Sequence, residues 1–332
     1  MQKEKINIAI LLGGNSPERA VSKQTGKSIY EAVIKLGYSV TLIDPAYGVD
    51  QPENTNDFFS DCDCRLVSNK NYIKSVNSKL FDNVDLALIA LHGKWGEDGA
   101  IQSLLELRGI KYTGSNVLGS SLSMDKARSK AVFTHFEVVT PKWIEATRQT
   151  NIELLDKQIT ETIKYPCIIK PNDQGSTIGL TKCNKKEELE EAVNLASQFS
   201  KIILLEEFIS GREFAVGIIN DKILPILEII PKHELYDYEC KYTDGMTEYI
   251  VPADLPESLV EELNEQTKLA FDSIGCKDYG RVDFRLDKNN KPYCLEVNTL
   301  PGMTSHSLVP KMARAAGIEF EELVDMIIKS AL

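Results

Sequence analysis

Apolar and polar positions along the first part of the chain follow the order expected for strands packed against helices. Residues 6–14 (INIAILLGG) form a nearly continuous apolar run that ends in two glycines, and residues 22–37 repeat apolar positions with a helical period. Residues 39–44 and 84–93 predict two more strands, the second apolar enough to be buried on both faces. We therefore expect an α/β unit here, with surface excursions in the polar stretch 45–77.

The middle of the chain predicts a small sheet with helices on one side. Residues 125–136 have a helical pattern, and residues 167–173 and 176–183 predict two strands around a Gln-Gly-Ser-Thr turn. An amphipathic helix over 185–199 and a strand over 201–209 complete this unit.

The last part of the chain predicts a strand over 212–220, a hairpin over 281–297 and two closing helices. Taken together, the pattern predicts an α/β fold class with α+β character in the C-terminal half. The predicted domains span residues 1–114, 115–210 and 211–332.

Composition excludes several classes of function. A net charge of -11 over 332 residues argues against a nucleic-acid binder, because phosphate neutralisation requires a surplus of Lys and Arg on one face. The seven cysteines show no paired spacing typical of a disulfide framework or a zinc site. The apolar run near the N-terminus is too short for a membrane span and no cleavage site follows it, so we expect a cytoplasmic protein without membrane contact.

Two glycine-rich stretches in the first domain are candidate binding sites. Residues 13–22 (GGNSPERAVS) lack the P-loop and dinucleotide fingerprints, but the free N-H groups of such a turn can hold an anion, with Glu18 and Arg19 beside it. Residues 91–100 place His92 at the end of a strand, where open α/β sheets bind ligands. The alternatives are a tight turn with solvated charges and a structural histidine.

Residues 168–180 (IIKPNDQGSTIGL) predict a phosphate site. Lys170 ends an apolar strand, and the small residues from Gln174 to Thr177 offer N-H groups and hydroxyls to phosphate oxygens. A strand-end lysine that is buried needs an anion to stay charged, which phosphate supplies. An ordinary turn is the alternative.

The hairpin over 281–298 predicts a metal site. Its Asn-Asn turn brings Asp283 near Glu296 and Asn298, and the last two share strand parity and so point to one face. Three oxygen ligands with room for water and phosphate oxygens describe a Mg²⁺ site that serves a nucleotide. Solvated hairpin carboxylates are the alternative.

Eight motifs together resemble the D-alanine-D-alanine ligase family of the ATP-grasp superfamily over essentially the whole chain. In order they are GGNSPERAVS, LHGKWGEDG, YTGSNVLGSSLSMDK, KPNDQGSTIGL, LEEFISGREF, YDYECKY, GRVDF and LEVNTLPGMTSHSLVP. The resemblance implies a three-domain ATP-grasp architecture with ATP between the central and C-terminal domains. It also implies a homodimer that joins two D-alanine molecules through an acyl phosphate, for peptidoglycan precursor synthesis.

The resemblance also implies roles for single residues in binding ATP. Lys126 and Lys170 are expected to bind phosphates, under a loop from Gln174 through Gly175 and Ser176 to Thr177. Adenine and ribose are expected to contact Glu206, Glu207, Phe208, Ile209 and Glu213. Asp283, Glu296 and Asn298 are expected to bind two Mg²⁺ ions, for which Mn²⁺ can substitute.

The remaining implied roles concern the amino acids. Glu18 is expected to bind the ammonium of the first D-alanine, with His92 close by. Ser307 and Leu308 are expected to bind the carboxylate of the second D-alanine. Arg281 and the N-H of Gly302 are expected to stabilise the tetrahedral intermediate. Ser176 and Tyr242 are expected to hold the loop 233–249 closed, with Lys241 facing the γ-phosphate.

Other functions remain open at this stage. A ligase that joins D-alanine to D-lactate or D-serine has the same fold, although relatives that use D-lactate carry Phe or a reorganised loop at Tyr242. A non-catalytic nucleotide or amino-acid binding protein is the rival from another class. An oxidoreductase is disfavoured because the dinucleotide fingerprint is missing.

Overall fold

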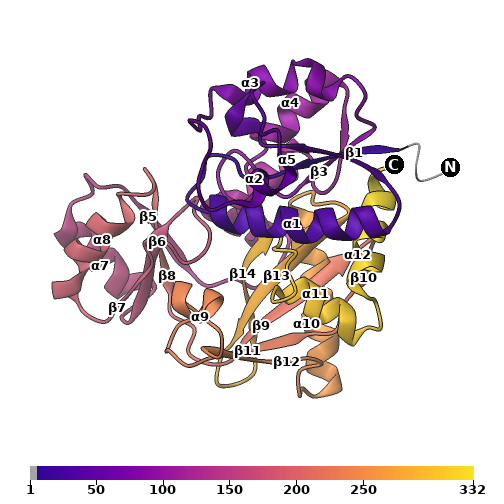
Figure 1. Ribbon diagram of the computed structural model, residues 1–332. Helices are drawn as coiled ribbons and strands as arrows, with labels where there is room; N and C mark the ends of the chain where they lie inside the picture. The colour runs from indigo at the N-terminus through magenta and orange to yellow at the C-terminus, as the bar shows by residue number, and fades with distance from the viewer. Residues whose placement is uncertain (1–5) are drawn as a thin grey trace.

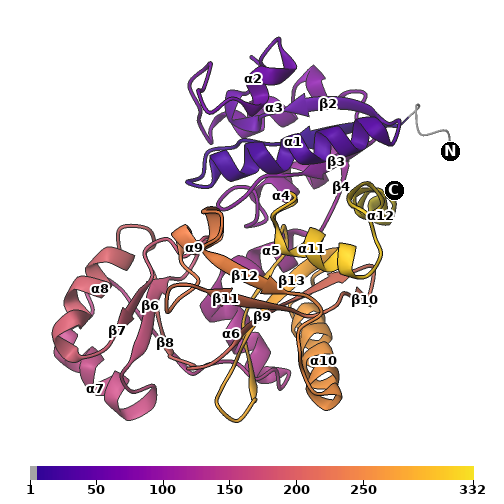
Figure 2. The ribbon, with the colours of Figure 1, turned by 60° about the horizontal axis from the view of Figure 1, so that its bottom comes forward.

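Three β-sheets organise the protein, one in each of the segments 1–114, 115–210 and 211–332 (Figure 1). The computed structural model describes residues 6–332, without the side chains of Tyr238 and Tyr242. Figures 1 and 2 both show the N-terminal sheet and its helices lying on one side of the other two sheets. The mixture of helices and sheets agrees with the predicted α/β fold class.

The N-terminal sheet is parallel, with strand order β2-β1-β3-β4. Its strands are β1 (Asn7–Leu11), β2 (Ser39–Ile43), β3 (Leu86–Ile89) and β4 (Lys111–Tyr112). Its helices are α1 (Arg19–Lys35), α2 (Thr55–Phe59), α3 (Asn71–Val76) and α4 (Ala100–Arg108). The continuous apolar runs of β1 and β3 are buried, as expected for parallel strands that are covered on both faces.

The stretch 45–77 is more than a surface excursion. It contains a 3-10 helix (Pro45–Tyr47) and helices α2 and α3. Phe58, Tyr72 and Val76 are buried in the same apolar core as β1 and β3. These apolar side chains lie singly among polar residues and show no helical or strand period, so the sequence did not predict that they are buried.

The central sheet is antiparallel, with strand order β5-β8-β6-β7. Its strands are β5 (Trp143–Ala146), β6 (Cys167–Pro171), β7 (Thr181–Cys183) and β8 (Ile203–Glu207), and its helices are α7 (Ile152–Thr162) and α8 (Leu189–Ala196). The expected turn at 174–177 is instead part of a longer loop, because β7 begins only at Thr181. Ser176 and Thr177 have φ values of 50° and 62°, in the left-handed region that a strand cannot use.

The third sheet carries most of the C-terminal segment. Its main path is β12-β11-β9-β13-β14, and β10 pairs with β9. The strands are β9 (Glu213–Ile219), β10 (Lys222–Ile223), β11 (Leu227–Pro231), β12 (Thr247–Ile250), β13 (Tyr279–Leu286) and β14 (Pro292–Asn298). The helices are α9 (Tyr238–Tyr242), α10 (Glu257–Ser273), α11 (Leu308–Ala315) and α12 (Phe320–Ala331).

Helices from neighbouring segments join the sheets. Helices α5 (Val117–Met124) and α6 (Lys126–His135) follow the N-terminal sheet in the chain, yet Phe133 of α6 packs in one core with Phe214 and Phe284 of the third sheet. Helix α12 lies beside α1, where the Tyr38 hydroxyl donates a hydrogen bond of 2.8 Å to Asp325. Among residues 6–332, no helix is long and apolar enough to cross a membrane.

We predict that Gly26→Ala destabilises the protein, although alanine favours a helix over glycine by about 1 kcal/mol. A Cβ atom at Gly26 would lie 2.7 Å from Cβ of Leu12, so α1 would have to move away from β1. We expect the free energy of unfolding to fall by about 1 to 3 kcal/mol, measured by denaturant unfolding. Lys27→Ala, on the exposed face of the same helix, is the control; a variant as stable as this control would contradict the close packing.

Candidate active site

Two adjoining cavities at the meeting of the sheets contain the predicted site residues. One lies between the central and third sheets, and the other lies between the N-terminal loops, the loop 233–249 and the start of α11. The first is lined by Lys126, Lys170, Gln174, Thr177, Glu206, Glu207, Phe208, Ile209, Glu213 and Asp283. The second is lined by Glu18, His92, Asn298, Gly302 and Ser307. Both are lined by Gly175, Ser176, Lys241, Arg281, Glu296 and Leu308.

Lys126 connects three elements. It is the first residue of α6, whose N-terminus is capped by Asp125, and its side chain is only 8% exposed. Its Nζ atom lies 2.9 Å from the backbone oxygen of Gln174 and 3.1 Å from Glu296 Oε2. Burial lowers the pKa of Lys126, but the Glu296 carboxylate outweighs burial and leaves the pKa raised. The ammonium is therefore positively charged where the 172–180 loop meets β14.

A buried triad of charges lies behind the first cavity. Glu206, 4% exposed, is 2.6 Å from Lys170 Nζ and 2.8 Å from Lys130 Nζ. Burial raises the pKa of Glu206, but the two lysines outweigh burial and lower it. Our sequence reasoning missed Lys130; the one available signal was its spacing of four residues from Lys126, which places both on one face of a helix. The side chain of Glu206 is thus held by two lysines, and both Glu206 and Lys170 line the cavity.

The loop 172–180 contacts two other loops. Ser176 Oγ donates a hydrogen bond of 2.5 Å to Glu18, and Thr177 Oγ1 donates one of 3.1 Å to the backbone oxygen of Tyr236. A Cβ atom at Gly175 would lie 2.9 Å from Glu18 Oε2, so glycine allows this approach. Two consecutive left-handed residues, Ser176 and Thr177, are a form of strain that is typical of ligand-binding loops.

Glu18 lies in a pocket between glycines. A Cβ atom at Gly93 would lie 2.7 Å from its Oε2 atom, and Gly175 covers the same carboxylate from the opposite loop. Burial and the neighbouring Glu97 raise the pKa of Glu18. Ser176, His92 and Lys241 act in the opposite direction, but the net shift of the pKa is upward. The carboxylate is therefore poorly solvated, and a cation that reaches it would stabilise the ionised form.

Both ring nitrogens of His92 contact side chains of the protein. Nε2 lies 2.9 Å from Thr25 Oγ1 and Nδ1 lies 3.1 Å from Glu97 Oε1. Burial lowers the pKa of His92, but the contact with Glu97 outweighs burial and the net shift is upward. The residue lines the second cavity, yet both of its ring nitrogens contact protein groups, so it shapes the pocket rather than offering a free donor.

The hairpin brings the predicted metal ligands together. Asp283 pairs directly with Glu296 across β13 and β14, and Arg281 pairs with Asn298. Burial raises the pKa of Glu296, but the charges of Lys126, Lys170 and Lys241 outweigh burial and lower the pKa to about 2. Glu296 is therefore ionised at neutral pH. Two carboxylates and an amide oxygen form the oxygen-rich donor set that fits Mg²⁺ or Mn²⁺.

Arg281 also binds Asp283 within the hairpin. Its Nε and Nη2 atoms donate hydrogen bonds of 2.7 and 2.8 Å to the two carboxylate oxygens of Asp283. This bidentate geometry fixes the plane of the guanidinium at the border of the two cavities. The sequence did not predict this contact. Arg281 was expected to bind the tetrahedral intermediate and Asp283 a metal ion, so no contact between the two was expected.

The loop 233–249 closes one side of both cavities. Glu234 forms an ion pair with Lys182 of β7, and the hydroxyls of Tyr236 and Tyr249 lie 2.9 Å apart. Asp237 accepts a hydrogen bond of 2.9 Å from the N-H of Cys240 and so caps α9. Lys241 faces both cavities. Burial lowers the pKa of Lys241 more than the nearby carboxylates of Glu296 and Glu213 raise it. The side chain of Tyr242 lies outside the described residues.

The stretch after β14 forms the far wall of the second cavity. Helix α11 begins at Leu308, and Thr304 donates its backbone N-H to Ser307 Oγ at 3.0 Å. A Cβ atom at Gly302 would lie 2.9 Å from Ser307 Oγ, so the glycine leaves room for this side chain. The N-terminus of α11, with its positive end toward the cavity, favours a negatively charged group there.

The outer end of the first cavity is apolar with a charged rim. Phe208 lies under Lys182 and Arg285, whose charged groups are 4.4 and 5.4 Å from the ring centroid. Ile209 is buried, and Glu213 lies 3.4 Å from Arg285. Glu207, at the end of β8, also lines this region. A flat apolar group with polar edges fits such a wall.

Comparison with known proteins identifies relatives along the whole chain. Family models described as D-ala D-ala ligase N-terminus and D-ala D-ala ligase C-terminus match residues 7–115 and 132–329. The D-alanine-D-alanine ligase of Syntrophotalea carbinolica is 40% identical over 336 residues, covering 100% of this chain and 99% of the relative. That of Haemophilus influenzae is 39% identical over 323 residues, covering 97% of this chain and 100% of the relative.

Solved structures agree with this relationship. The D-alanine-D-alanine ligase of Bacillus anthracis complexed with ATP aligns with a TM-score of 0.77 and 35% identity, covering 98% of this chain and 96% of that one. The VanG D-Ala:D-Ser ligase of Enterococcus faecalis aligns with a TM-score of 0.80 and 28% identity, covering 98% and 99%. The chain therefore has the ATP-grasp fold, and it belongs to the D-alanine-D-alanine ligase family.

Proposed function

We propose that this protein joins two D-alanine molecules to form D-alanyl-D-alanine, using ATP and releasing ADP and phosphate. The observation that carries this proposal is the pair of adjoining cavities, in which a lysine-rich wall and the poorly solvated carboxylate of Glu18 both border on Arg281. An acyl phosphate formed at this border can be attacked by a second amino acid without leaving the protein. The dipeptide serves peptidoglycan precursor synthesis, as in the family.

In this proposal, ATP occupies the first cavity with its phosphates at the lysines and its base at the apolar outer end. Lys126 and Lys170 supply positive charge to the phosphates, and the N-H groups of the loop from Gln174 to Thr177 cover them. The adenine ring fits against Phe208 and Ile209, and Glu207 and Glu213 lie near enough to the wall to bind the base and the ribose hydroxyls. Because Lys130 and Lys170 hold the Glu206 side chain, its contribution is to position Lys170.

Asp283, Glu296 and Asn298 are the residues that would hold Mg²⁺. Bound there, the metal would supply neutralisation of charge on the transferred phosphoryl group. Within this chain, Lys126 lies 3.1 Å from Glu296 and keeps the carboxylate ionised and oriented. Lys241 extends from the loop 233–249 toward the first cavity.

The first amino acid is placed by charge. Glu18 attracts the ammonium of D-alanine, and the carboxylate of D-alanine then points toward Arg281 and the phosphate loop. The contacts of Ser176 with Glu18 and of Thr177 with Tyr236 bring the covering loops over the reacting groups. Such a cover excludes water, which would otherwise hydrolyse an acyl phosphate.

The second amino acid is placed by the start of α11. Ser307 and the N-H of Leu308 lie where a carboxylate would be stabilised by the helix N-terminus. Arg281 and the N-H of Gly302 can donate to the oxyanion that forms when the amine attacks the acyl phosphate, where loss of one donor costs about 3 kcal/mol.

The first test is phosphate release from Mg-ATP, with D-alanine, L-alanine, D-serine and D-lactate tested in turn and each product identified by mass. We expect release with D-alanine alone, matched by D-alanyl-D-alanine. A product with D-serine or D-lactate in preference to D-alanine would overturn the acceptor assignment. ATP binding without release under any condition would instead indicate a non-catalytic binding protein.

We predict that Glu296→Gln lowers kcat by more than about 100-fold, because the neutral amide is a weaker ligand for a divalent cation and no longer pairs with Lys126. The measurement is steady-state phosphate release, with thermal unfolding to verify the fold. The matched control is Glu248→Gln, an exposed residue of β12, which should keep wild-type kcat. Activity within a few-fold of this control would remove Glu296 from the proposed metal site.

We predict that the apparent affinity for the first D-alanine decreases as the pH falls through the pKa of Glu18. Burial raises this pKa above the ordinary value of about 4.3, and a protonated carboxyl group no longer attracts the substrate ammonium. The measurement is the pH profile of kcat/KM for D-alanine, which should fall on the acid side at a pH above that of an exposed glutamate. In Glu18→Gln, this fall of kcat/KM at low pH should disappear. If the variant keeps the wild-type pH profile, a group other than Glu18 causes the fall.

A further inference from the structure

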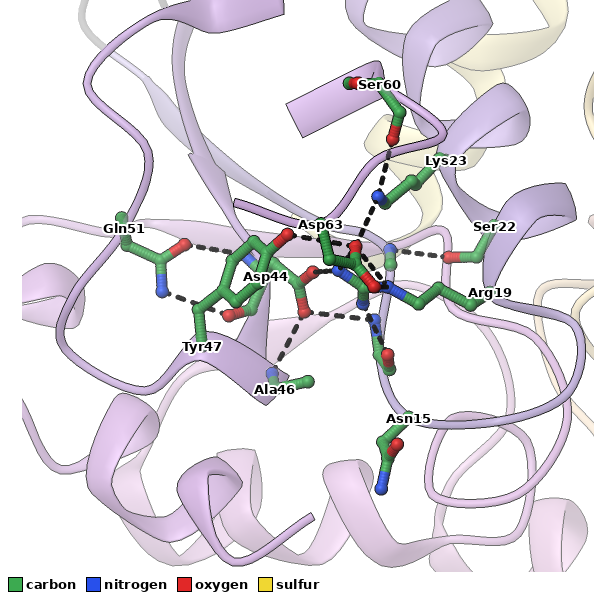
Figure 3. A network of polar contacts seen from close by, with 12 residues as sticks. Asn15, Arg19, Ser22, Lys23, Asp44, Ala46, Tyr47, Gln51, Ser60 and Asp63 are labelled. Carbon is green, nitrogen blue, oxygen red and sulfur yellow. Dashed lines mark hydrogen bonds and ion pairs between the residues drawn. The ribbon is translucent and has the colours of Figure 1, made fainter. Parts of the chain in front are cut away.

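A network of charges fastens the stretch 49–77 to the beginning of α1 (Figure 3). Its centre is Arg19, the first residue of α1 and the neighbour of Glu18 in the chain. The Arg19 guanidinium donates to Asp63 from Nε at 2.9 Å and from Nη2 at 2.7 Å, and Nη2 lies 2.7 Å from Asp44 Oδ2. Arg19 therefore binds two carboxylates that are 19 residues apart in the chain.

The network also fixes the glycine loop before Glu18. Arg19 Nη1 donates a hydrogen bond of 2.5 Å to the backbone oxygen of Gly14, and Asp44 Oδ1 accepts one of 3.0 Å from its N-H. Gly13 and Gly14 have φ values of 77° and 76°, and a Cβ atom at Gly13 would lie 2.2 Å from Asp44. The backbone that leads into Glu18 is thus set by the groups that surround Arg19.

Asp63 binds a second buried cation. Lys23, one turn after Arg19 on α1, has a side chain only 4% exposed, and its Nζ atom lies 2.7 Å from Asp63 and 2.6 Å from the backbone oxygen of Ser60. The Tyr47 hydroxyl donates to the same carboxylate at 3.1 Å. Burial raises the pKa of Asp63, but Arg19 and Lys23 outweigh burial and lower it to about 2. Asp63 is therefore ionised at neutral pH, where it pairs with both cations.

An anchored segment brings Asp63 to this position. Phe58 of α2 is buried in the N-terminal core, and the ring of Phe59 packs on Tyr30 of α1 with centroids 5.6 Å apart. The Tyr47 ring lies 5.0 Å from the guanidinium carbon of Arg19. The stretch 49–77 therefore covers the first turn of α1, on which Glu18 is the N-cap residue.

We propose that Asp63 is a positioning residue for the first amino acid, acting through Arg19; this inference rests on the proposed function. Glu18 and Arg19 are adjacent, opposite in charge and both poorly solvated. With Asp63 in place, the guanidinium is held by two carboxylates, and its Nη1 atom fixes the backbone oxygen of Gly14 in the loop that leads into Glu18. Without the Asp63 carboxylate, Arg19 keeps only Asp44, and the first turn of α1 loses its ion pairs with the stretch 49–77, so Glu18 is no longer held in the position that binds the substrate ammonium.

The test is Asp63→Asn, which keeps the shape and removes the charge. We expect the half-saturation concentration for the first D-alanine to rise about tenfold, with kcat and the KM for ATP changed less than about twofold. Hydroxylamine is added to trap the acyl phosphate as a hydroxamate, and the two D-alanine sites are separated by measuring phosphate release over a wide range of D-alanine concentrations. The matched control is Asp61→Asn, an exposed residue two positions away, which should behave as wild type.

Two further variants separate positioning from folding. Asp63→Glu keeps the charge and should restore most of the affinity. Arg19→Lys introduced into Asp63→Asn keeps a cation beside Asp44 and should not add to the loss, because Arg19 and Asp63 position Glu18 through the same set of contacts; the two effects are then non-additive. Additive losses, or a loss shared equally by D-alanine, ATP and thermal stability, would indicate a purely structural role and overturn the proposal.

The outcomes also distinguish this inference from the proposed function. If the wild-type protein forms no D-alanyl-D-alanine, the proposed function fails. If the wild-type protein is active and Asp63→Asn equals Asp61→Asn, only the role of Asp63 fails.

Discussion

The need to pair every poorly solvated charge determines how the three sheets meet. An isolated ion removed from water costs several kcal/mol, so each lysine and carboxylate in the cavities requires a partner. The partners come from different parts of the fold: Lys126 of α6 reaches Glu296 of β14 in the third sheet, and Lys130 of the same helix reaches Glu206 of β8 in the central sheet. The pairing therefore sets the distance between the central and third sheets. It also explains how a chain with a net charge of -11 presents a cationic surface to phosphates.

The parts of the site that depend on strand geometry could be predicted from the sequence. Glu296 and Asn298 share parity, and the Asn-Asn turn set the register that places Asp283 opposite Glu296. Strand and helix periodicity is a local property, so it predicted the α/β unit, the hairpin and the closing helices. The family motifs supplied the roles that local patterns left open.

The parts that depend on contacts between distant segments could not be predicted. Asp63 lies 44 residues from Arg19, in a polar stretch whose few apolar anchors give no periodic signal. Lys130 had no signal beyond its spacing from Lys126, because nothing in the chain indicates that Glu206 lies across from it. The loop 172–180 was expected to be a short turn, since left-handed φ values at Ser and Thr are a consequence of tertiary contacts rather than of residue type.

The position of Glu18 depends on contacts from two different units of the fold. Its position comes from the N-terminal unit, through the glycine loop and Arg19, whereas its carboxylate accepts a hydrogen bond from Ser176 of the central unit. Thr177, the next residue, contacts the loop 233–249, which carries Lys241. A cation bound at Glu18 would thus change the charge felt by the residues that cover the phosphates. Under the proposed function, amino-acid binding and closure of the loop 172–180 would be coupled through this one carboxylate, whose position is set by the network around Arg19.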